Sequence, residues 1–355
     1  MTEKDRFAAV DGLRMVAILW VAIYHYAVFW TPAGKGDNLI PYGDALAWIP
    51  LAAVGGLGVS LFFIISGFVI TLSLDRCENL RSFAALRVLR LWPTLFVCAT
   101  LTFVVTSLFG PAELSRDWVE YLISLTFVPP LHAGKIIGLS DLQWLDGAYW
   151  SLWVEVRFYA IAAVLHFGLR RHFLVGWACF AGATAMLHLF LLPEGHAVLR
   201  LLFSQYQPFF TMGIALAAVR ANGAGPLPVA LFAAGFLQAF AYAAPSADVL
   251  VGLSLVCLGA PLVILSRRRI PVLSATPVAR AGRASYAYYL LHQNIGLALL
   301  FVLAPADPVL AIGVMLTTQI AILAFSVWYT EVIEMPLLRR LRGRVRRPDH
   351  RPVAA

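Results

Sequence analysis

Residues 7–30 read FAAVDGLRMVAILWVAIYHYAVFW, an apolar stretch long enough to cross a bilayer as a single helix. No basic segment precedes it and no small-residue cleavage site follows it. It is also too long for a signal-peptide core, so we expect it to remain in the mature protein. Three ionisable residues interrupt the stretch: Asp11, Arg14 and His25. Such residues are costly inside hydrocarbon unless they are paired or hydrated, so this segment predicts a membrane fold with a polar interior.

The rest of the 355-residue chain has the same apolar character. Apolar residues make up 61% of the sequence and charged residues 13%, and the mean hydropathy is +0.79. Soluble domains carry about 25% charged residues, and a soluble fold with so few charges could not cover its surface. Disorder and a string of soluble domains are excluded for the same reason. The four cysteines are scattered, without a CxxC pair or a histidine at ligand spacing, so we expect neither disulfides nor a metal site.

Ten stretches are apolar and long enough to be spans: 8–30, 47–73, 88–109, 149–168, 173–192, 198–219, 227–243, 248–266, 284–304 and 308–334. Under this count, 20 of the 24 arginines lie on one side, which the positive-inside rule makes cytoplasmic. The apolar stretch 118–128 is too short to cross and is expected at the outer membrane surface. The sequence therefore predicts an all-α polytopic bundle of about ten transmembrane helices with both termini in the cytoplasm.

A basic tail is expected to follow the membrane domain. We place the membrane domain at 1–337 and the tail at 338–355, where seven arginines against Asp349 supply +6 of the net charge of +8. Such a run directly after a final span is typical of an anchor on anionic lipid headgroups. A nucleic-acid-binding arm is the alternative, and we expect no nucleic-acid partner.

One polar stripe follows the first span. Arg14 and His25 are eleven residues apart, which places them within about 20° of the same helix face and about 16 Å apart along the axis. Asp11, one turn before Arg14, is its expected ion-pair partner. The stripe is either a buried ion pair plus an interfacial histidine, or a hydrated conduit with chemistry at one end. We expect the conduit, as one tunnel shared by Arg14 and His25.

The fourth span carries a second polar face, formed by Ser151, Glu155 and Tyr159 at i, i+4 and i+8. Counted from the outer boundary, Glu155 lies at a depth similar to that of His25. A carboxylate beside an imidazole is suited to general acid–base catalysis, with Glu155 orienting His25 or binding the acceptor. The alternative is that Glu155 only pairs with Arg157 or Arg14 to hold helices together.

Further polar residues lie near the predicted cytoplasmic side. Arg87 and Arg90 are i, i+3 neighbours that could form a fork for phosphate oxygens, although lipid headgroups attract arginines at the same position. His292, about eight residues into the ninth span, is either structural or reactive. Glu331 and Glu334 are expected to be counter-charges for local arginines. The glycine-rich segment 55–68 is expected to let its helix break or approach neighbours closely.

Five motifs occur in the order found in one family. They are Asp11-Gly12-Leu13-Arg14 with His25, the run Gly58 to Phe68, Arg87-x-x-Arg90-x-x-Pro93, Trp150-Ser151-Leu152 leading to Glu155 and Tyr159, and Ser285-Tyr286 with Tyr289-Leu290-Leu291-His292. With these motifs the chain resembles the acyltransferase-3 family over about residues 5–337. The resemblance implies an integral protein of the bacterial inner membrane that uses cytoplasmic acyl-CoA, most commonly acetyl-CoA, as co-substrate and holds no tightly bound cofactor. The acceptor is a hydroxyl of a carbohydrate or glycosylated molecule.

The resemblance also indicates site residues. The family's first-span arginine and histidine correspond to Arg14 and His25, and its paired arginines to Arg87 and Arg90. We expect His25, Glu155 and Arg14 to be catalytic. Acyl-CoA is expected to bind at Arg87, Arg90 and His292, and the acceptor at Ser151 and Tyr159.

Two other functions remain open from the sequence. A transporter or flippase for an anionic substrate would also have ten spans and buried charges, although we find no internal duplication that favours it. A membrane scaffold without catalysis would explain the buried ionisable residues poorly.

Overall fold

Helices form all the regular structure in the part of the chain that the computed structural model describes, which is residues 3–30, 45–46, 48–243, 246–266, 268–303 and 307–345. Seven helical segments in these ranges are long and apolar enough to cross a membrane: 7–29, 57–74, 80–109, 147–191, 247–264, 285–303 and 309–341. The prediction of an all-α polytopic membrane bundle is confirmed. The count of ten spans and the cytoplasmic position of the termini stay predictions.

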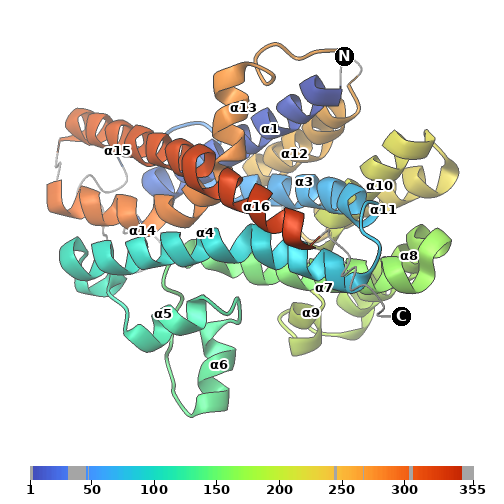
Figure 1. The fold of residues 1–355 in the computed structure, drawn as a ribbon, viewed down its shortest axis with the longest axis horizontal. Helices are drawn as coiled ribbons and strands as arrows, with labels where there is room; N and C mark the ends of the chain where they lie inside the picture. Colours follow the sequence, from blue (N-terminus) through green and yellow to red (C-terminus); the bar gives the residue numbers. More distant parts are fainter. Residues whose placement is uncertain are drawn as a thin grey trace, which may run out of the picture.

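Figure 1 shows how the helices are arranged along the chain. The first half contains α1 (Glu3–Tyr24), α3 (Leu57–Leu74), α4 (Leu80–Phe109), α5 (Trp118–Ser124), α6 (Pro130–Ile137), α7 (Trp150–Leu169) and α8 (Phe173–Met186). The second half contains α9 (Ala197–Leu201), α10 (Gln207–Asn222), α11 (Pro226–Ala241), α12 (Ala247–Ile264), α13 (Thr276–Arg283), α14 (Ser285–Leu303), α15 (Pro308–Tyr329) and α16 (Met335–Val345).

Several boundaries differ from the expected spans. Helix α4 begins at Leu80 rather than near 88, because the Asn79 side chain accepts a hydrogen bond from the Ser82 backbone and caps the helix there. The spans expected at 149–168 and 173–192 agree with the structure, as α7 and as α8 with its π-helical extension to Leu191. The chain turns between them at Arg170–His172, where Arg170 has a φ of 48°, and the Phe158 and Trp177 rings of the two helices lie 5.7 Å apart. Helix α16 runs across the predicted domain boundary at 337/338, and the remainder of the tail, 346–355, lies outside the described residues.

The apolar stretch 118–128 does not form a span. Its helix, α5, has seven residues and is about 10 Å long, far short of the hydrocarbon thickness. Together with α6 it projects from one side of the bundle (Figure 1), between the ends of α4 and α7. This agrees with the prediction that the segment does not cross.

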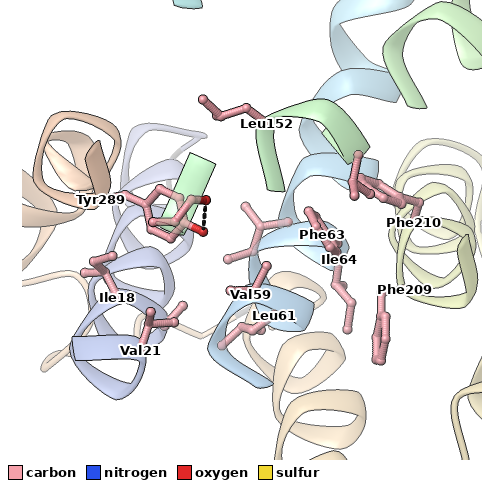
Figure 2. Packing of buried hydrophobic residues seen from close by; sticks show 14 of the residues in the cluster. Ile18, Val21, Val59, Leu61, Phe63, Ile64, Leu152, Phe209, Phe210 and Tyr289 are labelled. Atoms are coloured by element: carbon pink, nitrogen blue, oxygen red, sulfur yellow. Dashed lines mark hydrogen bonds between the residues drawn. The ribbon is translucent and has the colours of Figure 1, made fainter. Parts of the chain in front are cut away.

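Helix α3 lies at the centre of the bundle and packs against α1, α7, α10 and α12. Gly67 allows a close approach to α10, because a Cβ atom there would overlap the backbone of α10 at Phe210 and Gly213. The expected close approach through the glycine-rich segment is thus confirmed. Figure 2 shows part of the surrounding core, with Ile64 and Phe210 among its fully buried side chains.

Three helices among the described residues change from α- to π-helical geometry in segments that contain polar residues. Helix α8 does so over Leu187–Leu191, α1 over His25–Phe29, and α15 through Thr330–Glu334 into α16. Single π-helical turns are often found at functional sites, because the extra residue per turn redirects the side chains that follow. Here they redirect His25 and Glu334.

Candidate active site

A cavity of about 400 Å³ lies between α1, α3, α4, α7 and the start of α14. We call it the arginine cavity, because five arginines line it: Arg14, Arg76, Arg87, Arg90 and Arg283. Its other polar lining includes Ser66, Ser151, Glu155 and Tyr159. The expectation that Ser151, Glu155 and Tyr159 share a face is confirmed, since all three face this cavity.

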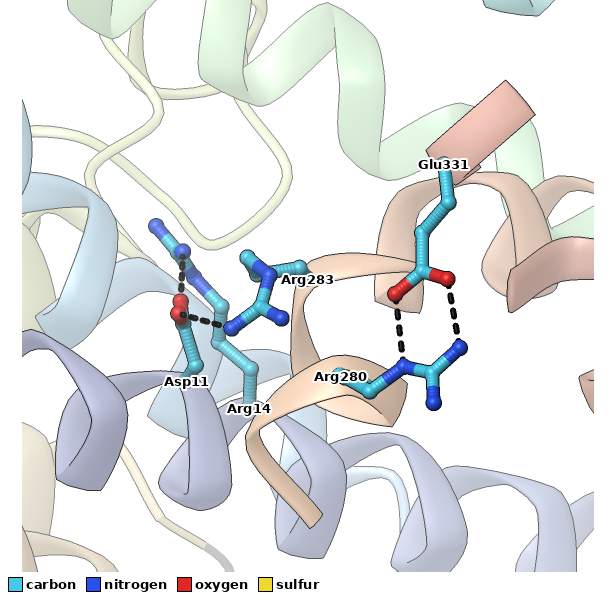
Figure 3. A network of polar contacts seen from close by, with 5 residues as sticks. All are labelled: Asp11, Arg14, Arg280, Arg283 and Glu331. Atoms are coloured by element: carbon cyan, nitrogen blue, oxygen red, sulfur yellow. Dashed lines mark hydrogen bonds and ion pairs between the residues drawn. The ribbon is translucent and has the colours of Figure 1, made fainter. Parts of the chain in front are cut away.

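Asp11, near the middle of α1, holds two of these arginines. The Arg14 guanidinium donates to the Asp11 carboxylate at 2.9 Å, which confirms the predicted i, i+3 pair. Arg283, from the end of α13, approaches the other carboxylate oxygen at 3.7 Å (Figure 3). A neighbouring pair joins Arg280 to Glu331 through two hydrogen bonds, 2.7 and 2.5 Å long, as Figure 3 also shows. One carboxylate therefore positions two guanidiniums at the cavity.

Arg87 and Arg90 are not equivalent, although the sequence suggested a symmetric fork. Arg90 forms an ion pair with the buried carboxylate of Glu334, brought over by the π-helical turn. Arg87 lies over the Phe83 ring at 5.4 Å, and its Nε is buried without a hydrogen-bond partner among the described residues. The expectation that Glu331 and Glu334 are counter-charges is confirmed. Among the described residues Arg87 has no ion-pair partner, so its guanidinium is the less committed of the two that line the cavity.

Glu155 is held from two sides by hydroxyl groups. Ser66 donates to its Oε1 at 2.7 Å, and Tyr159, one turn along α7, donates to the same oxygen. Arg157 points elsewhere and donates to the carbonyl groups of Arg200 and Leu201. Glu155 therefore does not form the expected contact with His25, because its carboxylate faces α3. Two residues at the same depth in the membrane meet only if their helix surfaces also face each other.

His25 lies in a second cavity, of about 690 Å³, between the outer parts of α1, α7 and α14 and the 111–147 segment. We call it the histidine cavity. Aromatic and amide side chains make up much of its remaining lining: Phe29, Trp30, Trp144, Trp150, Tyr206, Gln143, Gln293 and Asn294. Two polar atoms in this lining, the Trp30 indole Nε1 and the Asn294 Oδ1, are buried without a partner among the described residues. Buried polar atoms of this kind are satisfied when a ligand or water binds.

His25 has a histidine as its buried partner. Its Nδ1 lies 2.9 Å from Nε2 of His292 on α14, and the His292 Nδ1 lies 2.9 Å from the carbonyl oxygen of Tyr289. His292 is fully buried and lines neither cavity. The structure therefore does not place His292 at the expected acyl-CoA site. The position of His292, about eight residues into the span, does not determine which side of α14 its side chain occupies. It lies on the side that faces α1, where it contacts His25.

The two cavities meet at a wall that contains Val59 and Tyr289, which line both. The Tyr289 hydroxyl lies 2.9 Å from the Ser151 Oγ and donates to the Ala148 carbonyl, also at 2.9 Å. The single tunnel expected between Arg14 and His25 is thus divided, because this hydrogen-bonded phenol occupies the space between them. Ser151 belongs to the wall as well as to the arginine cavity.

Asp146 links α14 to the chain segment just before α7, both of which border the histidine cavity. Its carboxylate accepts hydrogen bonds from the backbone of Ala148 at 2.8 Å and of Asn294 at 3.0 Å. Burial raises the pKa of Asp146 to about 7, although these two hydrogen bonds and the charge of Arg116 oppose the shift. Arg116 donates hydrogen bonds to the same segment, at the Trp144 carbonyl and the Gln143 side chain.

Four residues of this region were not singled out by the sequence: Ser66, Tyr289, Trp30 and Asn294. Ser66 and Tyr289 lie within the motifs that carry the family resemblance, so their signal was present but could not be separated from that of their neighbours. Trp30 and Asn294 had no signal, since an aromatic residue at a span end and an amide within a span are both common structural features.

Comparison with known proteins gives one family and two relatives. The sequence model of the acyltransferase-3 family, described as an acyltransferase domain, matches residues 7–330. An O-acetyl transferase of Shigella phage Sf6 is 29% identical over 159 residues, which cover 43% of this chain and 44% of that protein. Nodulation protein 10 of Rhizobium leguminosarum bv. viciae is 29% identical over 147 residues, 36% of this chain and 38% of that protein. The chain thus matches less than half the length of each relative, and no solved structure matches it.

Proposed function

The chain belongs to the acyltransferase-3 family and is an integral membrane acyltransferase; from this premise we propose that it moves an acyl group, acetyl in the simplest case, from cytoplasmic acyl-CoA to a hydroxyl of a carbohydrate or glycosylated acceptor. The printed name of the phage relative, an O-acetyl transferase, supports an oxygen acceptor and an acetyl group. Relatives from a Shigella phage and a Rhizobium support a place in a bacterial inner membrane. We also propose that the basic tail contacts anionic lipids there.

One observation carries the proposal: a cavity lined by arginines and a cavity containing a histidine share a wall inside the membrane domain. Acyl transfer across a membrane needs an anionic donor on one side and a base next to an alcohol on the other. The arginine cavity opens where the positive-inside rule predicts the cytoplasm, and the histidine cavity at the opposite end. The arrangement therefore matches the two half-sites of such a reaction.

The donor site follows from the charges of the arginine cavity. Coenzyme A carries its negative charge on phosphate groups, for which guanidinium groups are the best-matched protein partners. Arg87 supplies a guanidinium that has no ion-pair partner among the described residues, and Arg14 and Arg283 supply the guanidiniums that Asp11 positions. With the phosphates held there, the thioester arm is directed toward Tyr289 and Val59.

The acceptor site follows from the lining of the histidine cavity. Aromatic rings stack on the apolar faces of sugars, and amide groups exchange hydrogen bonds with their hydroxyls. In the part of the chain that the structure describes, the Trp30 donor and the Asn294 acceptor have no partner, and hydroxyl groups can satisfy both. The acceptor hydroxyl would lie next to His25.

The reaction needs one proton carrier, and His25 is the candidate. For the thioester to reach the acceptor, the Tyr289 ring that divides the two cavities must turn aside. His25 then removes the proton from the acceptor hydroxyl as the oxygen attacks the thioester carbon. The new carbon–oxygen bond forms, the carbon–sulfur bond breaks, and His25 returns the proton to the departing sulfur of coenzyme A. Glu155, bound to Ser66 and Tyr159, contributes a charge to the donor side and does not orient the base.

The proposal is tested with the purified protein in lipid nanodiscs, given labelled acetyl-CoA and bacterial surface oligosaccharides. We expect acetylated oligosaccharide and free thiol in equal amounts, and a loss of about 100-fold or more in turnover for His25→Ala with an unchanged KM for acetyl-CoA. Full acyl transfer by a properly inserted His25→Ala protein would remove His25 from the mechanism. An intact thioester, together with movement of label across the membrane of proteoliposomes, would instead identify a transporter.

A further inference from the structure

The contact between His25 and His292 constrains where the protons of both rings lie. The His292 Nδ1 lies 2.9 Å from the Tyr289 carbonyl oxygen, and a carbonyl oxygen can only accept a hydrogen bond. The proton of a neutral His292 is therefore on Nδ1, which leaves Nε2 as an acceptor. Since this Nε2 lies 2.9 Å from Nδ1 of His25, it is His25 that donates in the contact.

This arrangement determines the tautomer of His25. A neutral imidazole carries one proton, and the contact with His292 holds it on Nδ1. The Nε2 of His25 then has a free lone pair. Because Nδ1 is turned toward fully buried His292 while His25 lines the histidine cavity, Nε2 is the nitrogen that faces the cavity.

We propose that His292 is a positioning residue that fixes His25 in the tautomer with a basic Nε2 at the histidine cavity. The inference rests on the proposed function, in which His25 takes the proton of the acceptor hydroxyl. In the other tautomer Nε2 would carry a proton and could not accept one. When His25 does accept the proton, its Nδ1–H remains bonded to the His292 lone pair, so the cation keeps a partner in a buried position.

The surrounding structure holds the His292 ring in the orientation that this role requires. The Tyr288 ring is nearly parallel to it, with 5.6 Å between centroids and 12° between planes. The hydroxyl of Tyr26, the residue after His25, donates to the His292 backbone carbonyl. The π-helical turn that begins at His25 therefore contacts His292 twice, through the His25 ring and through Tyr26.

Three variants at one position separate positioning from simple packing. His292→Phe keeps the ring and removes both nitrogens. In His292→Gln the side-chain amide extends to the Nε2 position, and its oxygen can accept the His25 proton. In His292→Asn the shorter side chain ends near the Nδ1 position, so its amide oxygen cannot reach the His25 Nδ1–H. His188, which lies 3.0 Å from the Ser204 hydroxyl, stacks on Tyr242 and lines neither cavity, provides the matched control His188→Gln.

Turnover, the KM for acetyl-CoA and thermal midpoint are measured for each variant, together with the 15N chemical shifts of labelled histidine, which distinguish the two tautomers. We expect His292→Phe and His292→Asn to lower kcat about 10- to 100-fold with an unchanged KM. This loss is a fraction of the rate enhancement that general base catalysis provides, because His25 itself is retained. His292→Gln should recover most of the loss, and His188→Gln should equal the wild type. In the wild-type spectrum the His25 proton should be on Nδ1.

Two results would overturn the positioning role. Equal kcat values for His292→Gln and His292→Asn would show that the acceptor at Nε2 is irrelevant, even if one or both were less stable. A His25 signal with its proton on Nε2 in the wild type would contradict the deduced hydrogen-bond direction. Either result with an inactive His25→Ala protein leaves the proposed function standing, whereas a fully active His25→Ala protein refutes that function first.

Discussion

Arg87 and Arg90 provide the sharpest test of the arginine cavity, because they are chemically identical, one helical turn apart, and differently paired. Arg90 forms an ion pair with buried Glu334, whereas the Nε of Arg87 has no partner among the described residues. We expect Arg87→Ala to weaken acyl-CoA binding with little effect on stability. Arg90→Ala should mainly destabilise the protein, since it leaves the Glu334 carboxylate buried beside an empty space.

The two effects have different magnitudes. A hydrogen bond from a guanidinium to a phosphate contributes about 1.5–3 kcal/mol, so Arg87→Ala should raise the KM for acyl-CoA about 10- to 100-fold. Removing one partner of a buried ion pair costs about 3–5 kcal/mol. Because the Arg90 side chain is 29% exposed, we expect the lower end of that range for Arg90→Ala. Removal of the second charge, in Arg90→Gln with Glu334→Gln, should restore most of the stability.

The measurements are steady-state kinetics with acetyl-CoA and thermal unfolding of the purified proteins in nanodiscs. Arg340→Ala, an exposed arginine on α16, is the control for unspecific loss of positive charge. A KM for Arg87→Ala that equals that of Arg340→Ala would contradict the proposed phosphate site. A double variant no more stable than Arg90→Ala would show that the ion pair with Glu334 does not account for the effect.

Three further outcomes are expected. Tyr289→Ala should open the wall between the cavities and raise acetyl-CoA hydrolysis without acceptor, measured as free thiol, while Tyr289→Phe keeps the ring and should not. Because burial raises the folded-state pKa of Asp146 to about 7, the free energy of unfolding should fall as pH rises from 5 to 8, and Asp146→Asn should flatten that dependence of the melting midpoint. Gly67→Val should lower the free energy of unfolding by about 1–3 kcal/mol or more, because the new side chain overlaps α10. Gly182→Val on α8, where a Cβ meets nothing within 4 Å, should lower it much less.

The sequence predicted the class of fold well, because membrane burial imposes a strong rule on composition. A helix must be apolar along its whole length, and that signal needs no knowledge of neighbouring helices. Helix ends were predicted less well for a local reason. At α4 the cap formed by Asn79 and Ser82 starts the helix about two turns before the apolar run, and polar residues at a helix end carry no hydropathy signal.

For the candidate site, the sequence predicted contacts within a helix and missed contacts between helices. The Arg14–Asp11 pair and the shared face of Ser151, Glu155 and Tyr159 both follow from helical periodicity, and both are present. Which helix each face meets depends on tertiary packing. Glu155 meets Ser66 instead of His25, and His292 meets His25 instead of the donor site. The sequence indicates how deep a residue lies in the membrane, but not how its helix is rotated about its axis, and the rotation decides which neighbouring helix the residue contacts.

The pairing of charges in this bundle follows a consistent division between the two cavities. On the arginine side, the carboxylates of Asp11 and Glu334 pair with Arg14 and Arg90, so the cationic lining is held in place while its net positive charge is retained. On the other side, His25 has a neutral partner. A carboxylate in the position of His292 would also orient His25 and would raise its proton affinity, but it would place a second charge in this buried contact, whereas an imidazole accepts the Nδ1 proton without one. The arginine side therefore uses ionic partners to hold a cationic lining, and the histidine side uses an uncharged hydrogen-bond acceptor to orient the base.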